Sequence, residues 1–90
     1  MNIIFAPTAW EDYQYWVAND RAVLERLNAL IKDASRSPFV GLGKPEPLVG
    51  KLKGCWSRRI TLEHRLIYRV SGSGDQQNIE IIACRWHYSR

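Results

Sequence analysis

Cysteine is scarce in this sequence. The 90 residues include only Cys55 and Cys84, which lie far apart in the chain. Neither has the C-x-x-C spacing that is typical of structural zinc sites and thioredoxin-like redox motifs, so we expect no metal site and no cofactor. In a reducing compartment both thiols are expected to be small buried hydrophobes rather than the two halves of a disulfide.

Long apolar runs are missing as well. Residues 1–7 contain no basic segment, and their apolar stretch is too short for a signal peptide or a membrane span. We therefore expect a cytoplasmic protein that does not contact a membrane. No repeat, low-complexity tract or linker interrupts the chain, and its length provides for one core, so we predict a single domain over residues 1–90.

Acidic residues are in the minority. The chain has 13 Lys and Arg against 9 Asp and Glu, which gives a formal net charge of +4. A basic balance favours an anionic partner such as a nucleic acid, although mild basicity also serves solubility alone.

The first half of the chain is expected to form a strand and two helices. Residues 2–6 are predicted to form a short buried strand, and a helix is predicted to follow with Thr8 and Glu11 as its capping box. Its apolar face is predicted to hold Trp10, Tyr13, Trp16 and Val17, with Glu11, Asp12 and Gln14 in water. Asn19-Asp20 is predicted to end this helix and to cap a second one, which ends at Ser37-Pro38. The second helix is predicted to bury Val23, Leu24, Leu27, Leu30, Ile31 and Ala34.

The second half reads as a loop followed by strands. Residues 38–54 are dense in glycine and proline and are predicted to form a stiff loop that leads into a short strand. Residues 56–60, 65–71 and 78–87 alternate between apolar and polar and are predicted to be strands. Their short connections require antiparallel pairing, so we predict an α+β fold in which an N-terminal strand and a helical hairpin pack on a twisted antiparallel sheet.

Four segments of the chain are distinctive, namely GKPEPL (43–48), WSRRIT (56–61), EHRLIY (63–68), and ACR followed by HY (83–85 and 87–88). Together they resemble the Txe/YoeB family of bacterial toxins. The resemblance extends over nearly the whole chain and includes the spacing of Trp10, Asp12, Tyr13 and Trp16. It implies a RelE-like fold and an endoribonuclease that cleaves mRNA in the A site of the translating ribosome. It also implies an acidic antitoxin of the YefM/Phd type that holds the enzyme inactive, and it allows a homodimer.

Metal-independent RNA cleavage needs a base for the 2'-hydroxyl, a cation for the phosphorane and an acid for the departing 5'-oxygen. Glu46, whose two flanking prolines keep its backbone extended, is the candidate base, as the resemblance also implies. Arg65 is the candidate for stabilising the transition state and Arg59 for holding the phosphate, because a guanidinium donates two parallel hydrogen bonds. His87 is the candidate acid, with protonation favoured by bound RNA. The resemblance adds Tyr88, which we expect to stack on a base or orient the phosphate.

Other polar and aromatic residues receive ordinary interpretations. Three lysines are expected to attract the RNA backbone without base selectivity, namely Lys44, Lys51 and Lys53. Three further arginines are expected to be surface residues or to do the same, namely Arg58, Arg69 and Arg85. His64 is expected to stabilise its turn through a local hydrogen bond. Trp56 and Trp86 are expected to pack in the core.

Two other classes of function stay open at this point. One is a non-catalytic ribosome-binding or RNA-binding module that inhibits translation by occupancy alone. Such a binder has no use for a carboxylate beside the phosphate, so replacing Glu46 by glutamine separates it from an enzyme. The other is a domain that only receives an acidic or amphipathic peptide. The presence of a short acidic open reading frame directly upstream bears on that choice.

Overall fold

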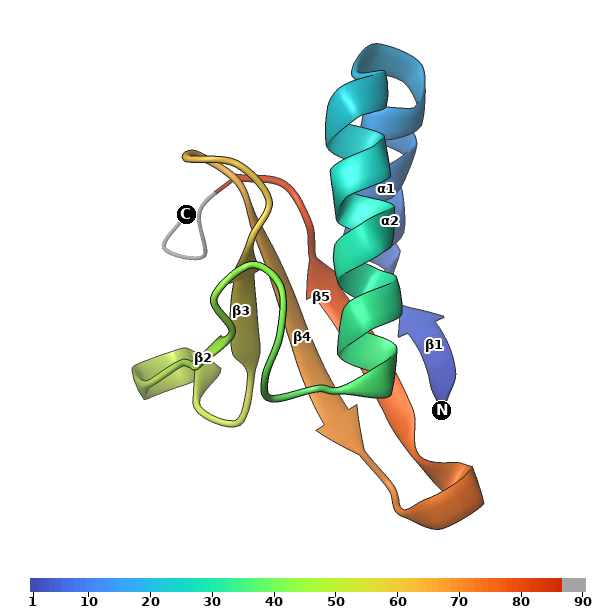
Figure 1. The fold of residues 1–90 in the computed structure, drawn as a ribbon, viewed down its shortest axis with the longest axis vertical. Coiled ribbons are helices and arrows are strands. Elements are labelled where there is room, and N and C mark those ends of the chain that lie inside the picture. The colour runs from blue at the N-terminus through green and yellow to red at the C-terminus, as the bar shows by residue number, and fades with distance from the viewer. Residues whose placement is uncertain (87–90) are drawn as a thin grey trace.

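The computed structural model describes residues 1–86 of the chain. Strand β1 (Asn2–Phe5) is followed by helices α1 (Pro7–Asn19) and α2 (Arg21–Arg36). The remaining strands are β2 (Glu46–Pro47), β3 (Trp56–Arg59), β4 (Arg65–Ser71) and β5 (Asn78–Ala83). Short 3-10 helices lie before β3 and β5, η1 (Gly50–Leu52) and η2 (Gly74–Gln76). Both long helices lie on one face of the sheet (Figure 1).

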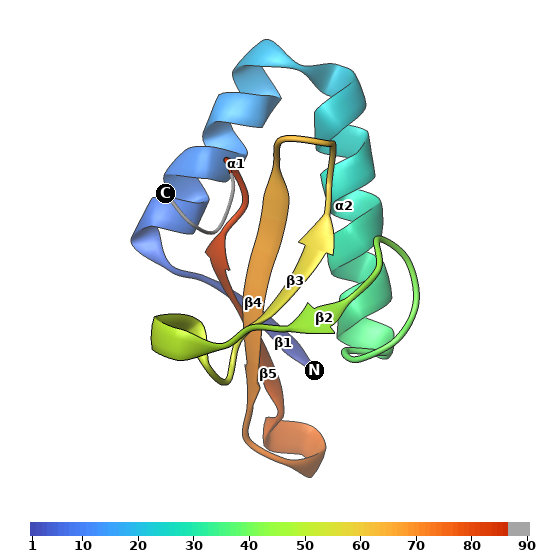
Figure 2. The same cartoon turned by 90° about the vertical axis from the view of Figure 1, so that its left-hand side faces the viewer.

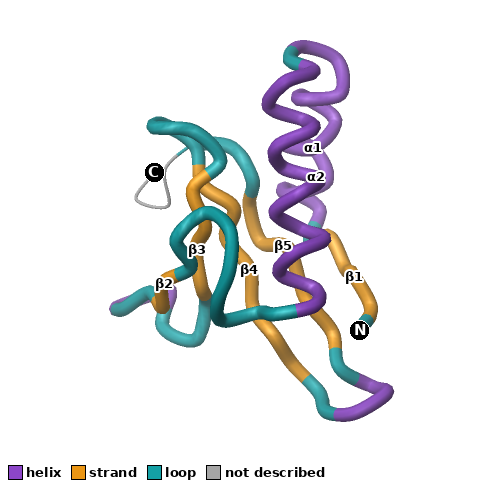
Figure 3. The backbone as a smooth tube through the Cα atoms, in the orientation of Figure 1, coloured by secondary structure: helices purple, strands orange, loops and turns teal. Residues whose placement is uncertain are grey.

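The strands, drawn in orange in Figure 3, form one sheet in the order β1-β5-β4-β3-β2. The pairs β2–β3, β3–β4 and β4–β5 are antiparallel, whereas β1 runs parallel to β5. The α+β class is confirmed, and the sheet is mixed rather than wholly antiparallel. The helical hairpin and the other strands separate β1 from β5 in the chain, and only a long connection of this kind permits a parallel pair.

Of the two predicted helix N-caps, the one for α2 is confirmed and the one for α1 is wrong. Asp20 caps α2, and its side chain accepts a hydrogen bond from the Val23 amide at 3.1 Å, as predicted. The capping box at Thr8 and Glu11 is wrong, because Pro7 occupies the first helical position and moves the N-cap to Ala6. The Thr8 hydroxyl instead donates to the carbonyl of Ile82 in β5.

Helix α1 turns a different face to the sheet than its aromatic pattern predicts. Its buried residues are Ala9, Asp12 and Trp16. Trp10 and Val17, which we expected in the core, are 51% and 52% exposed. The expectation that Asp12 lies in water is wrong too, because its carboxylate accepts a hydrogen bond from the backbone of the C-terminal segment. A helical pattern cannot reveal such a partner, which lies at the other end of the chain.

The main core lies between the helices and the sheet. Even-numbered residues of β3 and β4 point toward it, among them Leu66 and Tyr68. A smaller cluster of Leu48, Cys55 and Ile67 lies on the opposite face, under the connection between β2 and β3. Cys84 is buried in the main core, so both cysteines are small buried residues as predicted. Neither helix of residues 1–86 is long and apolar enough to cross a membrane.

Candidate functional site

The sheet register places three of the predicted site residues on the face that the helices do not cover. Glu46 lies opposite Ser57, and Arg59 lies opposite Arg65. Directly opposite residues of an antiparallel pair project to the same face, as do residues two apart on one strand. Because Leu66 next to Arg65 points into the helix-side core, the three charged side chains project to the other side. We call the surface formed by Glu46, Arg59 and Arg65 the site face. The side of the sheet to which it belongs, opposite the helices, faces the viewer in Figure 2.

Glu46 is exposed and begins the edge strand β2. Its segment is fastened to β3, because the Arg59 amide donates to the Gly43 carbonyl at 2.7 Å. Lys44, between these two points, is exposed and has a φ of +53°. Proline on both sides and a strand partner therefore hold the carboxylate at the edge of the site face.

Arg65 is half-buried and held over the turn that joins β3 to β4. Its Nη1 donates to the carbonyls of Thr61, Leu62 and His64 at 2.8, 3.0 and 3.1 Å. Within residues 1–86 its Nη2 makes no hydrogen bond, so one edge of a pre-oriented guanidinium remains for an anion. The Arg59 side chain, its strand neighbour, is exposed. The two arginines are therefore cross-strand neighbours whose side chains project to the same face.

The C-terminal segment beyond β5 is fixed to helix α1 and to the start of β4. The Cys84 amide donates to the Asp12 carboxylate at 3.0 Å, and the indole of Trp16 donates to the Cys84 carbonyl at 2.8 Å. The Arg65 amide donates to the Trp86 carbonyl at 3.0 Å. The last described residue thus lies beside Arg65. The predicted site residues that follow it lie outside the described residues, namely His87 and Tyr88.

The remaining basic residues are distributed more widely. Lys51 and Lys53 are exposed on the β2–β3 connection around η1, beyond the end of β2 that lies away from Lys44. Arg69 is exposed and pairs with Glu80 at 2.6 Å, in agreement with a surface role. Arg85 differs from its prediction, because its guanidinium carbon lies 3.4 Å from the centre of the Tyr15 ring and is held there by the aromatic face.

Of the two tryptophans expected in the core, one packs there and the other does not. Trp56 is half-buried against the main core and contacts the Phe39 ring, as predicted. Trp86 is 43% exposed, so its predicted core packing is wrong. The reason is that β5 ends at Ala83, before the alternation reaches this residue.

Arg58 is the largest error of the sequence interpretation. It is fully buried rather than on the surface. Its Nε donates to the Tyr68 hydroxyl at 3.0 Å, and Nη1 donates to the Asp33 carboxylate at 2.6 Å. Its other hydrogen bonds go to three loop carbonyls, those of Ser37, Val40 and Leu42. The sequence did contain a signal for this burial. Residues two apart on a strand project to the same face, so Arg58 shares the core face of β3 with Trp56. We call Arg58, Asp33, Tyr68 and residues 37–42 the arginine network.

Gly41 shows how closely the loop wraps this network. Its φ is +120°, and a side chain there would collide with the Asp33 carboxylate. Asp33 also accepts from the Leu42 amide at 3.0 Å. Only glycine tolerates both the backbone conformation and the close approach. The arginine network therefore fixes the loop that leads into Glu46.

The Asp33 carboxylate makes the stability of this network depend on pH. The Leu42 amide first, and then Arg58, lower the pKa of Asp33 from its ordinary value of 3.8. Folding therefore favours the ionised form, so its contribution is complete above pH 3.8 and is lost as the pH falls through the lower folded value. In urea denaturation from about pH 5 to about pH 2, the wild type should lose more free energy of unfolding than Asp33→Asn. Parallel losses in the two proteins would contradict this assignment.

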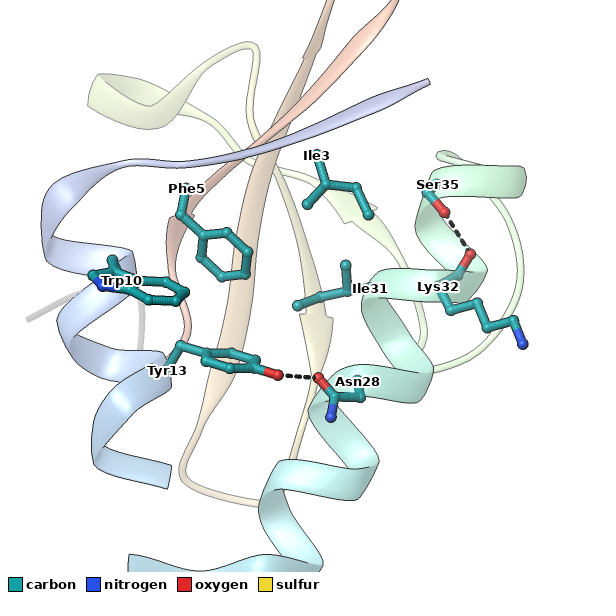
Figure 4. Close-up of a pocket in the computed structure, with 8 residues that line it drawn as sticks. All are labelled: Ile3, Phe5, Trp10, Tyr13, Asn28, Ile31, Lys32 and Ser35. Atoms are coloured by element: carbon teal, nitrogen blue, oxygen red, sulfur yellow. Dashed lines mark hydrogen bonds between the residues drawn. The ribbon is translucent and has the colours of Figure 1, made fainter. Parts of the chain in front are cut away.

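An apolar cavity of about 460 Å³ lies between β1, α1 and α2, away from the site face (Figure 4). The Tyr13 hydroxyl donates to the Asn28 side chain at 2.8 Å across its rim. Its lining is otherwise mostly apolar and includes Ile3, Phe5, Trp10 and Ile31. None of the predicted site residues in the described part of the chain lines it. Within residues 1–86 no group of three His, Cys, Asp or Glu residues could hold a metal ion.

Comparisons with known proteins place this geometry in a family. Residues 5–88 match the model of the YoeB-like toxin of bacterial type II toxin-antitoxin systems. Toxin YoeB of Escherichia coli K12 is 49% identical over 88 residues, which cover 98% of this chain and 100% of that protein. The YoeB/ParE toxin from Agrobacterium tumefaciens superposes with a TM-score of 0.95 at 53% identity, covering 98% and 100% of the two chains.

Solved structures of a further relative include its assemblies. YoeB from Staphylococcus aureus is 43% identical in a YoeB-YefM complex, with a TM-score of 0.85 and 98% of each chain covered. It has also been solved as a YoeB dimer, with a TM-score of 0.83. The RelBE2 toxin-antitoxin complex from Mycobacterium tuberculosis shares only the fold, at 24% identity and a TM-score of 0.63.

Proposed function

The chain belongs to the family of YoeB-like toxins of bacterial type II toxin-antitoxin systems, and from this premise we propose that it is a ribosome-dependent mRNA endoribonuclease. It cleaves by metal-independent acid and base catalysis, with the 2'-hydroxyl of the message as the nucleophile. By cutting the message in the A site it stops translation, and it acts in the cytoplasm, where ribosomes are.

The observation that carries the proposal is the composition of the site face. A carboxylate and two guanidiniums project from three adjacent strands to one side of the sheet. Glu46 at the strand edge is suited to take the proton of the 2'-hydroxyl. Arg65, whose Nη2 makes no hydrogen bond within residues 1–86, is suited to stabilise the charge that develops on the phosphorane, and Arg59 to hold the phosphate.

The remaining group that the proposed cleavage needs is a general acid. Trp86 is hydrogen-bonded to Arg65, and His87 follows it in the chain. We assign His87 the protonation of the departing 5'-oxygen and Tyr88 the orientation of the phosphate or stacking on a base. Lys44, Lys51 and Lys53 add sequence-independent affinity for the RNA backbone.

The partners follow from the relatives. YoeB of Staphylococcus aureus forms a complex with YefM and also a dimer. We propose that this chain is likewise neutralised by a YefM-like antitoxin whose acidic segment binds its basic surface, and that the unbound toxin forms a homodimer. The ribosome with mRNA in its A site is the proposed target.

The test maps mRNA ends on programmed ribosomes, with naked RNA alongside. We expect discrete cuts in the A-site codon with ribosomes and far weaker cleavage without them. Arg65→Ala should lower the single-turnover rate by about 10²–10³-fold, the cost of removing one donor to a developing anion. Arg69→Ala is the matched control, because Arg69 lies on the same strand but pairs with Glu80.

The outcomes separate the enzyme from the binder. Equal loss in both arginine variants would mean that Arg65 contributes only general charge. If translation stops while the message stays intact, the protein acts by occupancy and the nuclease proposal is wrong.

A further inference from the structure

Trp86 has a backbone conformation that its side chain disfavours. Its φ is +65°, in the left-handed region that non-glycine residues rarely adopt. A conformation of this kind costs of order 1–3 kcal/mol and persists only where the surroundings impose it. The left-handed turn also sets the direction of the chain immediately before His87.

Residues 64 and 65 impose this turn. The Trp86 amide donates to Nδ1 of His64 at 2.7 Å, and the Trp86 carbonyl accepts from the Arg65 amide at 3.0 Å. Both polar groups of residue 86 are thus held by two consecutive residues at the start of β4. His64 holds the Trp86 amide with its side chain, so this contact can be removed by mutation.

The His64 imidazole is itself held in place. Its ring contacts those of Trp16, at 4.8 Å between centroids, and Trp86, at 5.1 Å. The local hydrogen bond in the turn is made by its amide, which donates to the Thr61 hydroxyl at 3.1 Å, whereas its imidazole bonds the distant Trp86. A ring packed in this way cannot rotate to another partner without losing these contacts.

The surroundings of the His64 ring, burial first among them, favour its neutral form, which can accept a hydrogen bond. Burial, together with Arg85 and Arg65, lowers the pKa of His64 from 6.5, whereas Glu63 and Asp12 act in the opposite direction. The neutral imidazole therefore predominates at neutral pH, and its Nδ1 lone pair receives the Trp86 amide when the other nitrogen carries the hydrogen. An imidazolium would have no lone pair to offer.

We propose that His64 is a positioning residue of the site: its Nδ1 holds the Trp86 peptide against the start of β4 and so fixes the peptide from which the chain continues to His87. The inference rests on the proposed nuclease function, but it concerns a residue to which we assigned only a role in its turn. The side chains of Asp12 and Trp16 hold the backbone of Cys84 in the same way, two residues earlier in the chain.

A matched pair of variants tests the proposal. His64→Asn keeps an acceptor oxygen near the position of Nδ1, whereas His64→Leu has a similar shape and no acceptor. At saturating programmed ribosomes, His64→Leu should cleave about 10²-fold more slowly than the wild type, the cost of a misplaced catalytic group. His64→Asn should retain most of the rate, and the ribosome concentration for half-maximal rate should be unchanged in both.

A second variant removes the donor and leaves the imidazole intact. Because Cys84 is a natural ligation site, residues 84–90 can be joined as a synthetic peptide in which an ester replaces the amide of Trp86. The full-length ester protein should reproduce the loss seen with His64→Leu. It decides the matter even where His64→Leu fails to fold, which circular dichroism would show.

The possible failures are distinct. A wild type that does not cleave overturns the proposed function. A cleaving wild type whose ester and leucine variants keep the same rate overturns the positioning role alone. Loss of rate in the asparagine variant equal to that in a folded leucine variant would also overturn it, because an acceptor would then be irrelevant.

Discussion

Replacement of Arg58 by methionine is expected to lower the free energy of unfolding by about 3–5 kcal/mol, the usual cost of removing one partner from a buried ion pair. Methionine keeps much of the apolar stem but donates no hydrogen bond. Asp33 would lose its ion-pair partner, and the loop carbonyls of the arginine network would lose their donors. Buried acceptors without a donor are costly because water cannot replace the lost bond. Urea denaturation at neutral pH measures the difference.

The chain supplies a matched control in the next residue. Arg59 lies on the same strand, faces the other side and is exposed, so Arg59→Met should change stability by no more than about 0.5 kcal/mol. Arg58→Lys should fall between the two, because an ammonium keeps the charge but cannot reach partners on both sides as the guanidinium does. Similar losses in Arg58→Met and Arg59→Met would contradict the assignment of the buried network.

The same pair separates folding from RNA binding. Arg59→Met should weaken ribosome-dependent cleavage in a protein of normal stability, whereas Arg58→Met should act through the loop that carries Glu46. The loop 37–43 has few apolar residues in the core and is held chiefly by hydrogen bonds to Arg58 and Asp33. The position of this loop therefore depends on Arg58, on the helix side of the sheet. Glu46, the proposed base, follows the loop and depends on it in turn.

Local patterns in the sequence were sufficient to locate the helices and strands. They were wrong about the first strand, which is largely exposed rather than buried, and about the end of the last strand, which lies at Ala83 rather than at residue 87. The alternation in residues 65–71 predicted β4 with its observed ends, and Asp20 capped α2 as its type and position indicated. Short turns between consecutive strands required the antiparallel pairs that connect β3, β4 and β5. These features depend on neighbours in the chain, which one sequence contains in full. The resemblance to the toxin family, now confirmed, supplied the fold name.

Contacts between residues far apart in the chain could not be predicted from these local patterns. Asp12 is buried because a backbone amide at the other end of the chain needs an acceptor, and Arg58 because loop carbonyls do. The parallel pairing of β1 likewise depends on how the helical hairpin packs. Charge and hydropathy place such residues in water by default, and only the assembled fold shows what pairs with them. For the site, the register brings Glu46, Arg59 and Arg65 to one face, and the roles of these residues remain predictions, as do those of His87 and Tyr88.

The last prediction concerns Glu46, whose replacement by glutamine should lower the single-turnover cleavage rate by about 10²–10⁴-fold, the usual contribution of a general base. Glutamine has nearly the same shape, so the β2–β3 pairing that holds the residue should survive. What is lost is the group that accepts the proton of the 2'-hydroxyl. End mapping on programmed ribosomes measures the rate, and unfolding by urea verifies the fold.

The charge change makes this variant decisive between catalysis and occupancy. Removing a carboxylate from a face with two guanidiniums should strengthen the attraction for RNA, so ribosome binding should be equal or tighter even as cleavage fails. A protein that inhibits by occupancy would become an equal or better inhibitor. Glu11→Gln, exposed on α1 across the sheet, provides the same change in net charge at a distance and should alter neither property. Unchanged cleavage in Glu46→Gln would remove Glu46 as the base, because an amide cannot take the proton in its place.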